Sequence, residues 1–477
     1  MIKTDICVIG GGSGGLSVAA GAVQMGASVV LCESGKMGGD CLNYGCVPSK
    51  AMIEASRVMH QVGKAKGFGI DVIQAEVDYK KVQQHVKNVI AKIEPHDSVE
   101  RFESLGVKVI QHHAELVDRY TVKADDQIIK AKYIVLATGS RANIPPIKGL
   151  DVVKYYTNEN IFDLDKQPEH LLVIGGGPIG VELAQAHALL GSKVTIIEVG
   201  ENILAPVDSD ARDIVLKEFE CLGIDVVTNA NIQSIQQSQG SIEISFGDSR
   251  SESGMTKCVG SHLLIAAGRK PNIESLGLDT AGVNSTQKSI VTDNRLRTNH
   301  KNVFAIGDIA GPFQFTHAAG YQAGIVIQNI LFKLPVKVSY KAFPWSVYTT
   351  PEISHVGMSM SDAEKQGAKI LEITYNDNDR AQAGLATNGL VKVAVDKKGY
   401  ILGATIIGEN AGDLITQWTI AINNKLKIKA MASHIVAYPS LSELNKRVAG
   451  SYFTPTLYSE KVRKVVMLLM KIFGKKI

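Results

Sequence analysis

Apolar and polar positions follow the same order twice along the chain. Residues 5–15 are a short apolar run that ends in a cluster of glycines, and residues 171–180 repeat this pattern. Each is followed by a helix-like stretch rich in Ala, Val and Leu, and then by a second apolar run at 28–32 or 193–197. This order predicts two strand–helix–strand (βαβ) units, which are typical of parallel α/β sheets.

Each predicted unit carries the spacing G-x-G-x-x-G directly after its first strand. The motif glycines are Gly10, Gly12 and Gly15 in the first unit and Gly175, Gly177 and Gly180 in the second. The first glycine permits a tight turn, the second lets the backbone approach a pyrophosphate, and the third lets the helix pack closely on the strand. Glycines also serve in plain turns, but two complete units in register indicate two dinucleotide-binding sites.

An acid ends the second strand of each unit, at the same distance from the last glycine. These acids are Glu33 and Glu198, and a carboxylate at this position accepts hydrogen bonds from a ribose diol. Two such sites predict one bound flavin and one exchanging nicotinamide. Because the carboxylate of Glu198 repels the 2′-phosphate of NADP and suits the 2′-hydroxyl of NAD, we expect a preference for NAD(H).

The remaining pattern predicts further strands and a change of fold class after residue 341. Residues 68–130 mix helical and short strand patterns. Buried strands are predicted at 107–110, 133–139, 263–269 and 303–308. Later predicted elements are strands at 391–395 and 401–407, a turn at 396–399, and helices at 411–424 and 442–449. We therefore expect an α/β fold with two Rossmann-like domains, followed by a separate α+β domain.

The composition is that of an ordinary folded protein. The chain has 477 residues, of which 45% are hydrophobic and 21% charged, and this length corresponds to roughly three domains. The net charge of +4 is too small to indicate a nucleic-acid partner. The sequence shows no secretory signature and no apolar stretch long enough to span a bilayer, so we expect a cytoplasmic protein.

Six cysteines in a chain of this length do not make the disulfide framework of a secreted protein. Cys41 and Cys46 form a close pair with the spacing C-x₄-C, and the other cysteines are isolated. No second cysteine or histidine pair has zinc-ligand spacing, which favours a redox role. On an ideal helix the two side chains would point about 140° apart. A bond between them therefore requires a distorted turn, which Gly45 and Pro48 permit.

The segment around this pair resembles the signature of the class I pyridine nucleotide-disulfide oxidoreductases. It reads Gly38-Gly39-Asp40-Cys41-Leu42-Asn43-Tyr44-Gly45-Cys46-Val47-Pro48-Ser49-Lys50. The family includes dihydrolipoyl dehydrogenase, glutathione reductase and mercuric reductase. The resemblance covers nearly the whole chain, with further motifs at 137–139, 268–272, 305–308 and 350–352. It implies an FAD- and NAD(H)-dependent homodimer with a redox-active disulfide between Cys41 and Cys46 and an active site shared across the dimer interface.

The resemblance also implies roles for individual residues. Cys46 would be the flavin-side sulfur that forms a charge-transfer thiolate, and Cys41 the outer sulfur that attacks the substrate. Lys50 would lie near flavin N5 and raise its electron affinity, and Glu182 would pair with Lys50. The implied FAD-binding residues are Gly10, Gly12, Ser13, Gly14, Gly15, Glu33, Gly39, Asp40, Lys50, Ala114, Thr138, Gly139, Asp308 and His317. The implied NAD-binding residues are Gly175, Gly177, Ile179, Gly180, Glu198 and Gly268, and no resident metal is implied.

The chain departs from the disulfide-reducing members of the family near its C-terminus. Those members carry a His-Pro pair ahead of a Glu, and the histidine, supplied by the partner subunit, protonates the outgoing thiol. Here Tyr438 occupies the histidine position and Glu443 supplies the acid, while His434 is out of register. A tyrosine, with a pKa of about 10, is a poor base at neutral pH.

Mercuric reductases also have a tyrosine at this point, so the chain resembles a mercuric-reductase-like core. It has no cysteine after Cys258 and no N-terminal metal-binding domain to deliver the metal. The favoured function is a reductase that passes two electrons from NADH through the cysteine pair to a disulfide or a metal ion. The second is a dihydrolipoyl dehydrogenase of a 2-oxo acid dehydrogenase complex, against which Tyr438 argues. The third, supported only by the C-terminal tail, is a membrane-docked electron carrier.

Five segments are expected along the chain. They are the first part of the FAD-binding domain at 1–148, the NAD-binding domain at 149–269, the second FAD-binding or central part at 270–338, a dimerisation domain at 339–460 and a basic amphipathic tail at 461–477. The NAD-binding domain interrupts the FAD-binding domain, because the second glycine motif lies between the two FAD-binding parts.

The tail, from residue 460, continues past the usual end of this family's last domain. One helical face carries Val462, Val465, Val466, Leu469 and Phe473, and another carries Lys461, Lys464, Lys471 and Lys475. A basic amphipathic helix can lie on an anionic membrane and would give a cytoplasmic enzyme a peripheral membrane contact. A helix packed on the dimer fits the same pattern and is the favoured interpretation.

Overall fold

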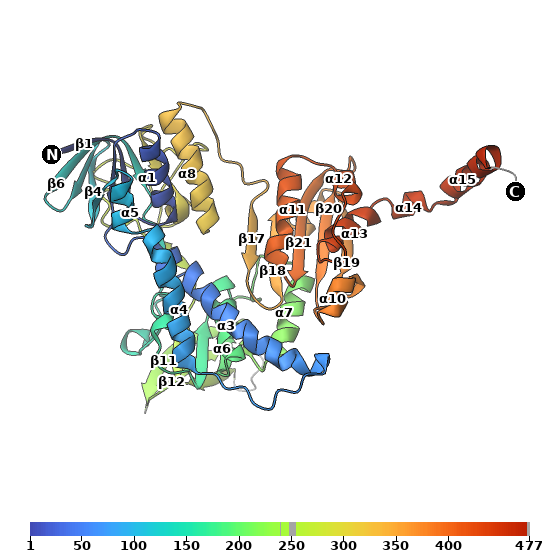
Figure 1. Cartoon of the computed structure of the whole chain (residues 1–477). Coiled ribbons are helices and arrows are strands. Elements are labelled where there is room, and N and C mark those ends of the chain that lie inside the picture. Colours follow the sequence, from blue (N-terminus) through green and yellow to red (C-terminus); the bar gives the residue numbers. More distant parts are fainter. Residues whose placement is uncertain (239, 248–253, 475–477) are drawn as a thin grey trace. The chain divides into compact units, whose positions relative to one another are not determined.

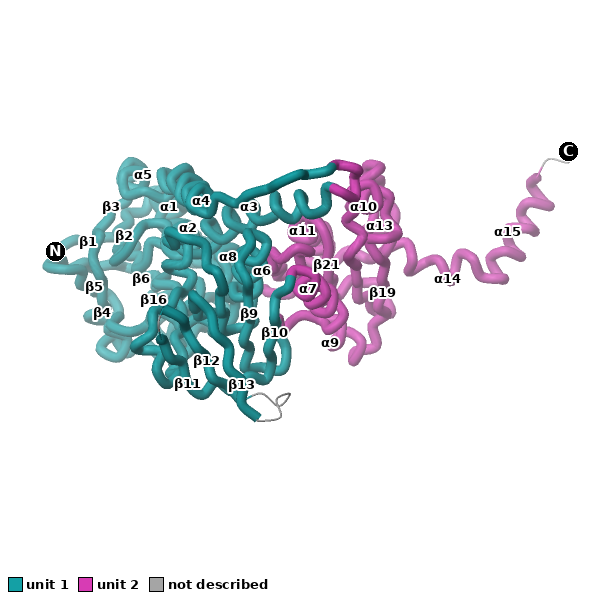
Figure 2. Tube along the Cα trace, turned by 90° about the horizontal axis from the view of Figure 1, so that it is seen from below, with its two compact units in different colours: residues 1–65, 71–203, 223–338 teal, residues 66–70, 204–222, 339–477 magenta. Residues whose placement is uncertain are grey.

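The structure is a computed structural model that describes residues 1–238, 240–247 and 254–474 (Figure 1). It divides into two compact units (Figure 2). Unit 1 consists of residues 1–65, 71–203 and 223–338, and unit 2 of residues 66–70, 204–222 and 339–477. These units are coarser than the five segments expected from the sequence, and the five-segment division stays a prediction.

The larger sheet of unit 1 has seven strands, in the order β3-β2-β1-β6-β5-β4, with β16 paired to β6. Its parallel strands are β1 (Ile2–Ile9), β2 (Val29–Cys32), β3 (Lys108–Ile110), β6 (Gln127–Leu136) and β16 (Val303–Ala305). An antiparallel meander on β6 adds β4 (Ala114–Asp118) and β5 (Thr121–Ala124). The strands predicted at 28–32, 107–110, 133–139 and 303–308 are confirmed, with ends that differ by a few residues.

Both faces of β1 are covered, which explains its uninterrupted apolar run. Ile6 and Val8 pack in a core with α1 (Ser13–Gln24) and α8 (Thr316–Leu331), whereas Cys7 and Ile9 belong to a second core with β4 and β5. Strands buried on both faces lose the alternation of apolar and polar residues. The end of β1 is therefore fixed directly before the first glycine loop. The other α-helices of the described part of unit 1 are α2 (Gly39–Asn43), α3 (Cys46–Lys64), α4 (Tyr79–Ile93), α5 (Val99–Ser104) and α6 (Pro178–Leu189).

The second βαβ unit forms a smaller parallel sheet in the order β10-β9-β8-β14. Its strands are β8 (His170–Ile174), β9 (Lys193–Ile197), β10 (Asp225–Val227) and β14 (His262–Ile265), and α6 connects β8 with β9. An antiparallel sheet consists of β11 (Asn231–Ser238), β12 (Ser241–Gly247) and β13 (Met255–Gly260). A two-stranded ribbon pairs β7 (Ser140–Ala142), which follows β6, with β15 (Arg269–Pro271), which follows β14.

The two glycine motifs have the same backbone geometry. Gly10 and Gly175 have φ angles of +111° and +114°, and a Cβ atom on either would lie 2.3 Å from a backbone carbonyl oxygen. A Cβ atom on the third glycine would lie 1.8 Å (Gly15) or 2.0 Å (Gly180) from the carbonyl oxygen of the first. Close packing leaves no room for a side chain at such distances. The structure thus repeats one turn, with the same glycine requirements, in both units.

Unit 2 is built on a five-stranded antiparallel sheet in the order β17-β18-β21-β20-β19. Its strands are β17 (Pro344–Val347), β18 (Glu352–Gly357), β19 (Lys369–Thr374), β20 (Leu390–Val395) and β21 (Ile401–Gly408). Its α-helices in the described residues are α7 (Ser209–Cys221), α9 (Met360–Lys365), α10 (Asp379–Ala383), α11 (Ala411–Asn423), α12 (Ile428–Ser433), α13 (Glu443–Ser451), α14 (Thr454–Leu457) and α15 (Glu460–Phe473). The α+β domain expected after residue 341 is confirmed, since β20, β21, α11 and α13 match the predicted elements.

Helix α7 groups with unit 2, although in the sequence it lies between β9 and β10 of the smaller parallel sheet. Lys392 of β20 forms an ion pair with Asp210 of α7. Thr405 of β21 donates a hydrogen bond of 3.4 Å to Asp208, which precedes α7 by one residue and is 197 residues away in the chain. Contacts over such separations leave no local pattern in the sequence, so the sequence did not predict them.

The chain's last described helix, α15, has no buried side chain. Lys475, expected on the polar face of the tail, lies outside the described residues. In the part of the chain that the structure describes, no helix has both the length and the apolar character needed to cross a membrane.

A substitution at the third glycine of the second motif tests the shared turn. We expect Gly180→Ala to cost about 1–3 kcal/mol of stability, because the added methyl group overlaps the Gly175 carbonyl. The matched control is Gly63→Ala on α3, where a Cβ atom meets open space and the change is neutral or slightly stabilising. Thermal unfolding of the two variants measures the difference, and equal unfolding midpoints would contradict the proposed packing.

Candidate active site

The segment with the two cysteines begins directly on the first glycine loop. Gly39 has φ +58°, and a Cβ atom on it would lie 2.7 Å from the Cα atom of Gly12. The preceding Gly38 donates a 2.9 Å hydrogen bond from its N–H to the carbonyl oxygen of Gly11. Only glycine allows this conformation and this approach together. The start of the cysteine segment is therefore fixed directly against the dinucleotide loop.

Cys41 and Cys46 lie on two different helices. Helix α2 ends at Asn43, Gly45 interrupts the chain with φ −120° and ψ −108°, and α3 begins at Cys46. A Cβ atom on Gly45 would lie 2.8 Å from a carboxylate oxygen of Asp40, so the chain passes close to the Asp40 side chain at this interruption. This break removes the 140° divergence expected on a continuous helix. Both thiols are free in this structure and they hydrogen-bond to each other, which corresponds to the dithiol form of the pair.

The two thiols differ strongly in acidity. The hydrogen bond from Cys41, followed by that from Thr316 and the charge of Lys50, lowers the pKa of the Cys46 thiol to about 6. The pKa of the Cys41 thiol is raised well above its usual range, by its interaction with Cys46 and by burial. These opposite shifts favour a thiolate on Cys46 and a thiol on Cys41, and the thiolate is the reactive form of cysteine.

Thr316 contacts Cys46, and the sequence did not predict this contact. Its Oγ1 lies 3.3 Å from Sγ of Cys46, and the two residues are 270 positions apart. Thr316 is the first residue of α8, a 16-residue helix whose N-terminus carries partial positive charge. A threonine at the start of a long apolar helix is the available signal in the sequence, but it does not reveal what the helix end faces.

Lys50 and Glu182 form an ion pair with 2.7 Å between Nζ and Oε2. Lys50 lies one turn after Cys46 on α3, and Glu182 lies in the first turns of α6, where its side chain is only 6% exposed. The pair therefore connects the cysteine helix with the second dinucleotide unit. The resemblance implied this pairing, and the function of Lys50 beside a flavin stays a prediction.

The acids at the ends of the second strands hold the glycine loops. Glu33 accepts hydrogen bonds from the N–H groups of Gly11 and Gly35. Glu198 accepts equivalent bonds of 2.6 Å from Gly176 and Gly200. Each carboxylate oxygen has a second lone pair, so both acids can also accept a ribose hydroxyl.

The middle glycines leave space where phosphates would bind. Gly12 and Gly177 are the N-caps of α1 and α6, and neither helix end has a side-chain cap. A Cβ atom on Gly177 would meet no described atom within 4 Å, and one on Gly12 would meet only Gly39, at 3.8 Å. Free N–H groups and the positive end of a helix dipole attract phosphate. The residues present therefore fit FAD at the first loop and NAD(H) at the second.

Asp308, expected to bind FAD, belongs to a partly buried polar cluster. Ser140 donates a hydrogen bond to its carboxylate, and Arg269 lies between Asp308, at 3.7 Å, and Asp40, at 3.1 Å. Burial raises the pKa of Asp308, while Ser140 and Arg269 act in the opposite direction. Arg269 was not among the expected site residues, although it directly follows the expected Gly268 in the sequence.

The other expected cofactor residues lie at the edges of these loops. Ser13 opens α1 and hydrogen-bonds to Cys41. Thr138 donates a 2.6 Å bond to the carbonyl of Asn272, and Gly139 and Gly268 have φ angles of +67° and +89° with open space beside them. The remaining positions are Gly14 in α1, Ala114 at the buried start of β4, Ile179 in α6, and His317 in α8 beside Phe315. All of these cofactor assignments stay predictions.

Tyr438 and Glu443 belong to unit 2. The Tyr438 hydroxyl donates a 2.9 Å hydrogen bond to Asp379, and this bond raises the pKa of the tyrosine. Glu443 is the first residue of α13, and Arg447 lies 4.0 Å from it. His434, which is out of register with the family's histidine, has its Nδ1 2.8 Å from the carbonyl oxygen of Met431 and follows the end of α12 directly. The proposed part of Tyr438 and Glu443 in catalysis stays a prediction.

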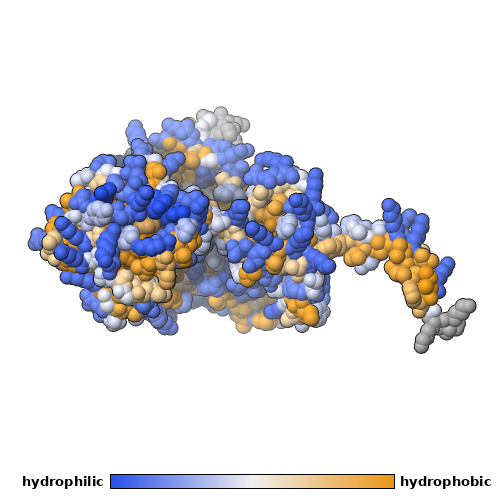
Figure 3. Space-filling view, turned by 90° about the horizontal axis from the view of Figure 1, so that it is seen from above, coloured by the Kyte–Doolittle hydropathy of each residue, from blue (hydrophilic) through white to orange (hydrophobic). Residues whose placement is uncertain are grey.

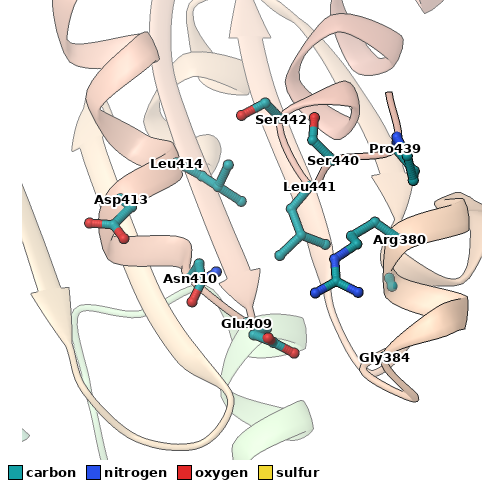
Figure 4. A pocket seen from close by; sticks show the side chains of 11 residues that line it. Arg380, Gly384, Glu409, Asn410, Asp413, Leu414, Pro439, Ser440, Leu441 and Ser442 are labelled. Atoms are coloured by element: carbon teal, nitrogen blue, oxygen red, sulfur yellow. The ribbon is translucent and has the colours of Figure 1, made fainter. Parts of the chain in front are cut away.

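Unit 2 also contains a pocket of about 330 Å³ beside the loop that follows Tyr438 (Figure 4). Ser440, Leu441 and Ser442 line one part of it, and Arg380 and Asp413 contribute opposite charges. Its lining has no cysteine or histidine, so it offers neither a thiol for redox chemistry nor an imidazole for proton transfer.

Removal of the Thr316 hydroxyl tests the acidity of Cys46. We expect Thr316→Val to raise the pKa of Cys46 above about 6, because the variant loses a hydrogen bond that stabilises the thiolate. The rate at which iodoacetamide alkylates the reduced protein would then increase over a higher pH range than in the parent. Thr419→Val is the matched control, since its hydroxyl bonds only within α11. An unchanged pH profile for Thr316→Val would contradict the contact.

The Lys50–Glu182 pair can be tested against an exposed pair on the same helix. We expect Glu182→Gln to lower the turnover of NADH at least about tenfold, because Lys50 loses the charge that holds it in place. Glu54→Gln removes one ion-pair partner of Arg57, in a pair whose acid is 62% exposed, and should change turnover less than about twofold. Steady-state kinetics distinguish the two, and equal losses would show that the position of Lys50 does not matter.

Sequence comparison places both units in known families. The family described as pyridine nucleotide-disulphide oxidoreductase matches residues 4–323, and its dimerisation domain matches residues 343–449. A dihydrolipoyl dehydrogenase of Geobacillus stearothermophilus is 33% identical, over 94% of this chain and 96% of the relative. A mercuric reductase of Bacillus cereus is 31% identical, over 92% of this chain and 70% of the relative.

Structural comparison gives the same result. The Cu(II) complex of the HOCl-induced flavoprotein disulfide reductase RclA from Escherichia coli superposes with a TM-score of 0.85. That structure is 27% identical and covers 94% of this chain and 100% of its own chain. LpdA from Mycobacterium tuberculosis, 24% identical, shares the fold with a TM-score of 0.86 over 95% of this chain and 100% of its own. The chain belongs to the pyridine nucleotide-disulphide oxidoreductases, a family of flavoprotein enzymes that use FAD and NAD(H) and that carry a dimerisation domain, which supports a homodimer.

Proposed function

We propose that this enzyme transfers two electrons from NADH through the Cys41–Cys46 pair to a soft metal ion or a disulfide, with the metal ion as the better acceptor. The metal ion is preferred because Tyr438 donates a hydrogen bond to Asp379 and because the pKa of the Cys41 thiol is high. The enzyme would then be a reductase of the mercuric-reductase type.

The chain's own residues bind and orient the reactants. The two glycine loops, with Glu33 and Glu198, would hold the two dinucleotides, and Glu198 favours NADH over NADPH. FAD held at the first loop and by Glu33 would supply the hydride-accepting and two-electron chemistry between NADH and the disulfide. Lys50, held by Glu182, keeps a positive charge beside Cys46 and so favours the thiolate that forms there.

The chemistry balances without a further reactant. NADH gives up two electrons and one proton equivalent as hydride, and reduction of the Cys41–Cys46 bond yields one thiolate and one thiol. Reoxidation of the pair restores the S–S bond and releases two electrons, which reduce one Hg²⁺ to the metal or two Cu²⁺ to Cu⁺. The proton of the Cys41 thiol is released to solvent when the metal binds, because a metal-bound thiol is deprotonated.

A disulfide acceptor makes a different demand on the same pair. Cys41 would have to lose its proton before attacking the acceptor, and its raised pKa makes this unfavourable at neutral pH. The family's histidine would accept that proton, but a tyrosine whose pKa is raised by Asp379 does not. A soft metal ion displaces the proton itself, so it does not need the missing base.

The relatives support an acceptor of this kind. The structurally similar RclA was solved with Cu(II), and several relatives with about 30% identity are mercuric reductases. We infer further that the active site is shared across a homodimer, so that Tyr438 of the partner subunit would face the cysteine pair. The matched dimerisation domain, which includes Tyr438 and Glu443, supports this arrangement.

Dihydrolipoyl dehydrogenase is the second candidate. Two relatives with this activity match at 33% and 34% identity over 94% and 92% of the chain, slightly above the 29–31% of the mercuric reductases. Their similarity favours lipoamide as an acceptor, whereas Tyr438 argues against it. Lipoamide turnover as fast as the metal-dependent turnover would reverse the order of the two proposals.

The experiment is an anaerobic NADH assay with lipoamide, glutathione disulfide, Hg²⁺, Cu²⁺ and a quinone as acceptors, using the parent and Tyr438→His. We expect the parent to prefer the metal ions. We expect Tyr438→His to raise lipoamide turnover about 10²-fold or more, the usual contribution of a general acid–base group, without a comparable gain for metal ions. Equal gains for all acceptors would exclude the proton-transfer argument.

Cys46→Ser is the control for the disulfide pathway in the same assay. Its metal-ion and lipoamide turnover should be lost, while direct transfer from the flavin to a quinone is unaffected. A variant that reduces the best acceptor at the parent's rate would show that the cysteine pair is not on the electron path.

A further inference from the structure

Helix α15 carries one apolar and one charged stripe along its 14 residues (Figure 3). Residues three and four positions apart share a helix face. Val462, Val465, Val466, Leu469, Ile472 and Phe473 lie on the apolar stripe. The opposite stripe, at positions 460, 464, 467 and 471, contains Glu460, Lys464, Met467 and Lys471.

The apolar stripe is open to solvent in the chain. Leu469 is 47% exposed, Ile472 60% and Phe473 79%. A run of large apolar side chains at this exposure is unfavourable in water and marks a surface that binds a partner. Ser459 caps the helix by accepting a hydrogen bond from the N–H of Val462, so the helix has a defined start as well as a defined face.

The position of α15 in the sequence argues against the partner subunit as its occupant. The family's dimerisation domain matches residues 343–449 and ends before α14 and α15. The matched dimerisation domain therefore does not include the tail. This boundary favours a membrane contact, whereas the sequence alone favours packing on the dimer.

The charges of the helix indicate what it binds. Helix α15 contains one acidic residue, Glu460, and four basic residues, Lys461, Arg463, Lys464 and Lys471. Lys461 and Arg463 flank the apolar stripe, where long side chains can extend to lipid phosphates while the stripe enters the acyl region, and the other two lysines lie on the opposite stripe. A helix of 14 residues is about 21 Å long, shorter than the roughly 30 Å of a bilayer core, so it would lie in the membrane plane.

We propose that α15 docks the enzyme on the surface of an anionic lipid bilayer, with the apolar stripe inserted and the basic flank on the headgroups. The docking is independent of which acceptor the cysteine pair reduces. It requires both the stripe and the charges, because a single weak hydrophobic contact or a few basic residues alone give only marginal membrane binding.

The test is co-sedimentation of the full-length holoenzyme with vesicles of phosphatidylcholine alone and of phosphatidylcholine with phosphatidylglycerol. We expect binding to the anionic vesicles, little binding to the neutral ones, and a loss of binding in high salt. Absence of binding to the anionic vesicles, or equal binding to both kinds, would overturn the proposal.

Two matched substitutions separate the stripe from the rest of the helix. Leu469→Gln places an amide in the apolar stripe and should weaken vesicle binding about tenfold, whereas Met467→Gln on the charged stripe should change it less than about twofold. Both variants should keep the parent's NADH turnover in the absence of vesicles. If Leu469→Gln dissociates the dimer in light scattering and leaves vesicle binding unchanged, the partner subunit occupies the stripe and the proposal is wrong.

Discussion

The contact between Gly39 and Gly12 is the constraint on which the rest of the active site depends. With 2.7 Å between the Cα of Gly12 and the place where Gly39 would have a side chain, the cysteine helices begin on the dinucleotide loop itself. This contact places the start of α2, and with it Cys41, directly beside the first glycine loop. Under the proposed function, this position would keep the cysteine pair close to a dinucleotide bound at the loop.

In both dinucleotide units, an acid at the end of the second strand holds the glycine loop. In each, the acid at the end of the second strand accepts the N–H of the motif's second residue, Gly11 or Gly176. The acid thus orients the loop before any ribose binds, which reduces the ordering cost of binding. The Lys50–Glu182 ion pair joins α3, which carries Cys46, to α6, which follows the second glycine motif.

The cysteine pair is chemically asymmetric because its surroundings are asymmetric. Cys46 faces the N-terminus of α8 and the charge of Lys50, and both stabilise a thiolate. Cys41 has Cys46 itself as its strongest neighbour, so its proton is retained. An acceptor that coordinates sulfur benefits from this arrangement, whereas one that must be attacked by Cys41 needs a base. Under the proposed function, the identity of residue 438 would therefore influence the choice of acceptor more than the pair does.

The sequence by itself determined the two βαβ units, the α+β domain, the cysteine pair and the replacement of histidine by Tyr438. These features depend on local spacing, on glycine conformation and on the period of apolar residues, all of which can be read along the chain. The tertiary structure decided that Thr316 lies beside Cys46, that Arg269 lies between Asp40 and Asp308, and that α7 groups with unit 2. Each of these contacts joins residues far apart in the sequence, so only the folded chain brings them together.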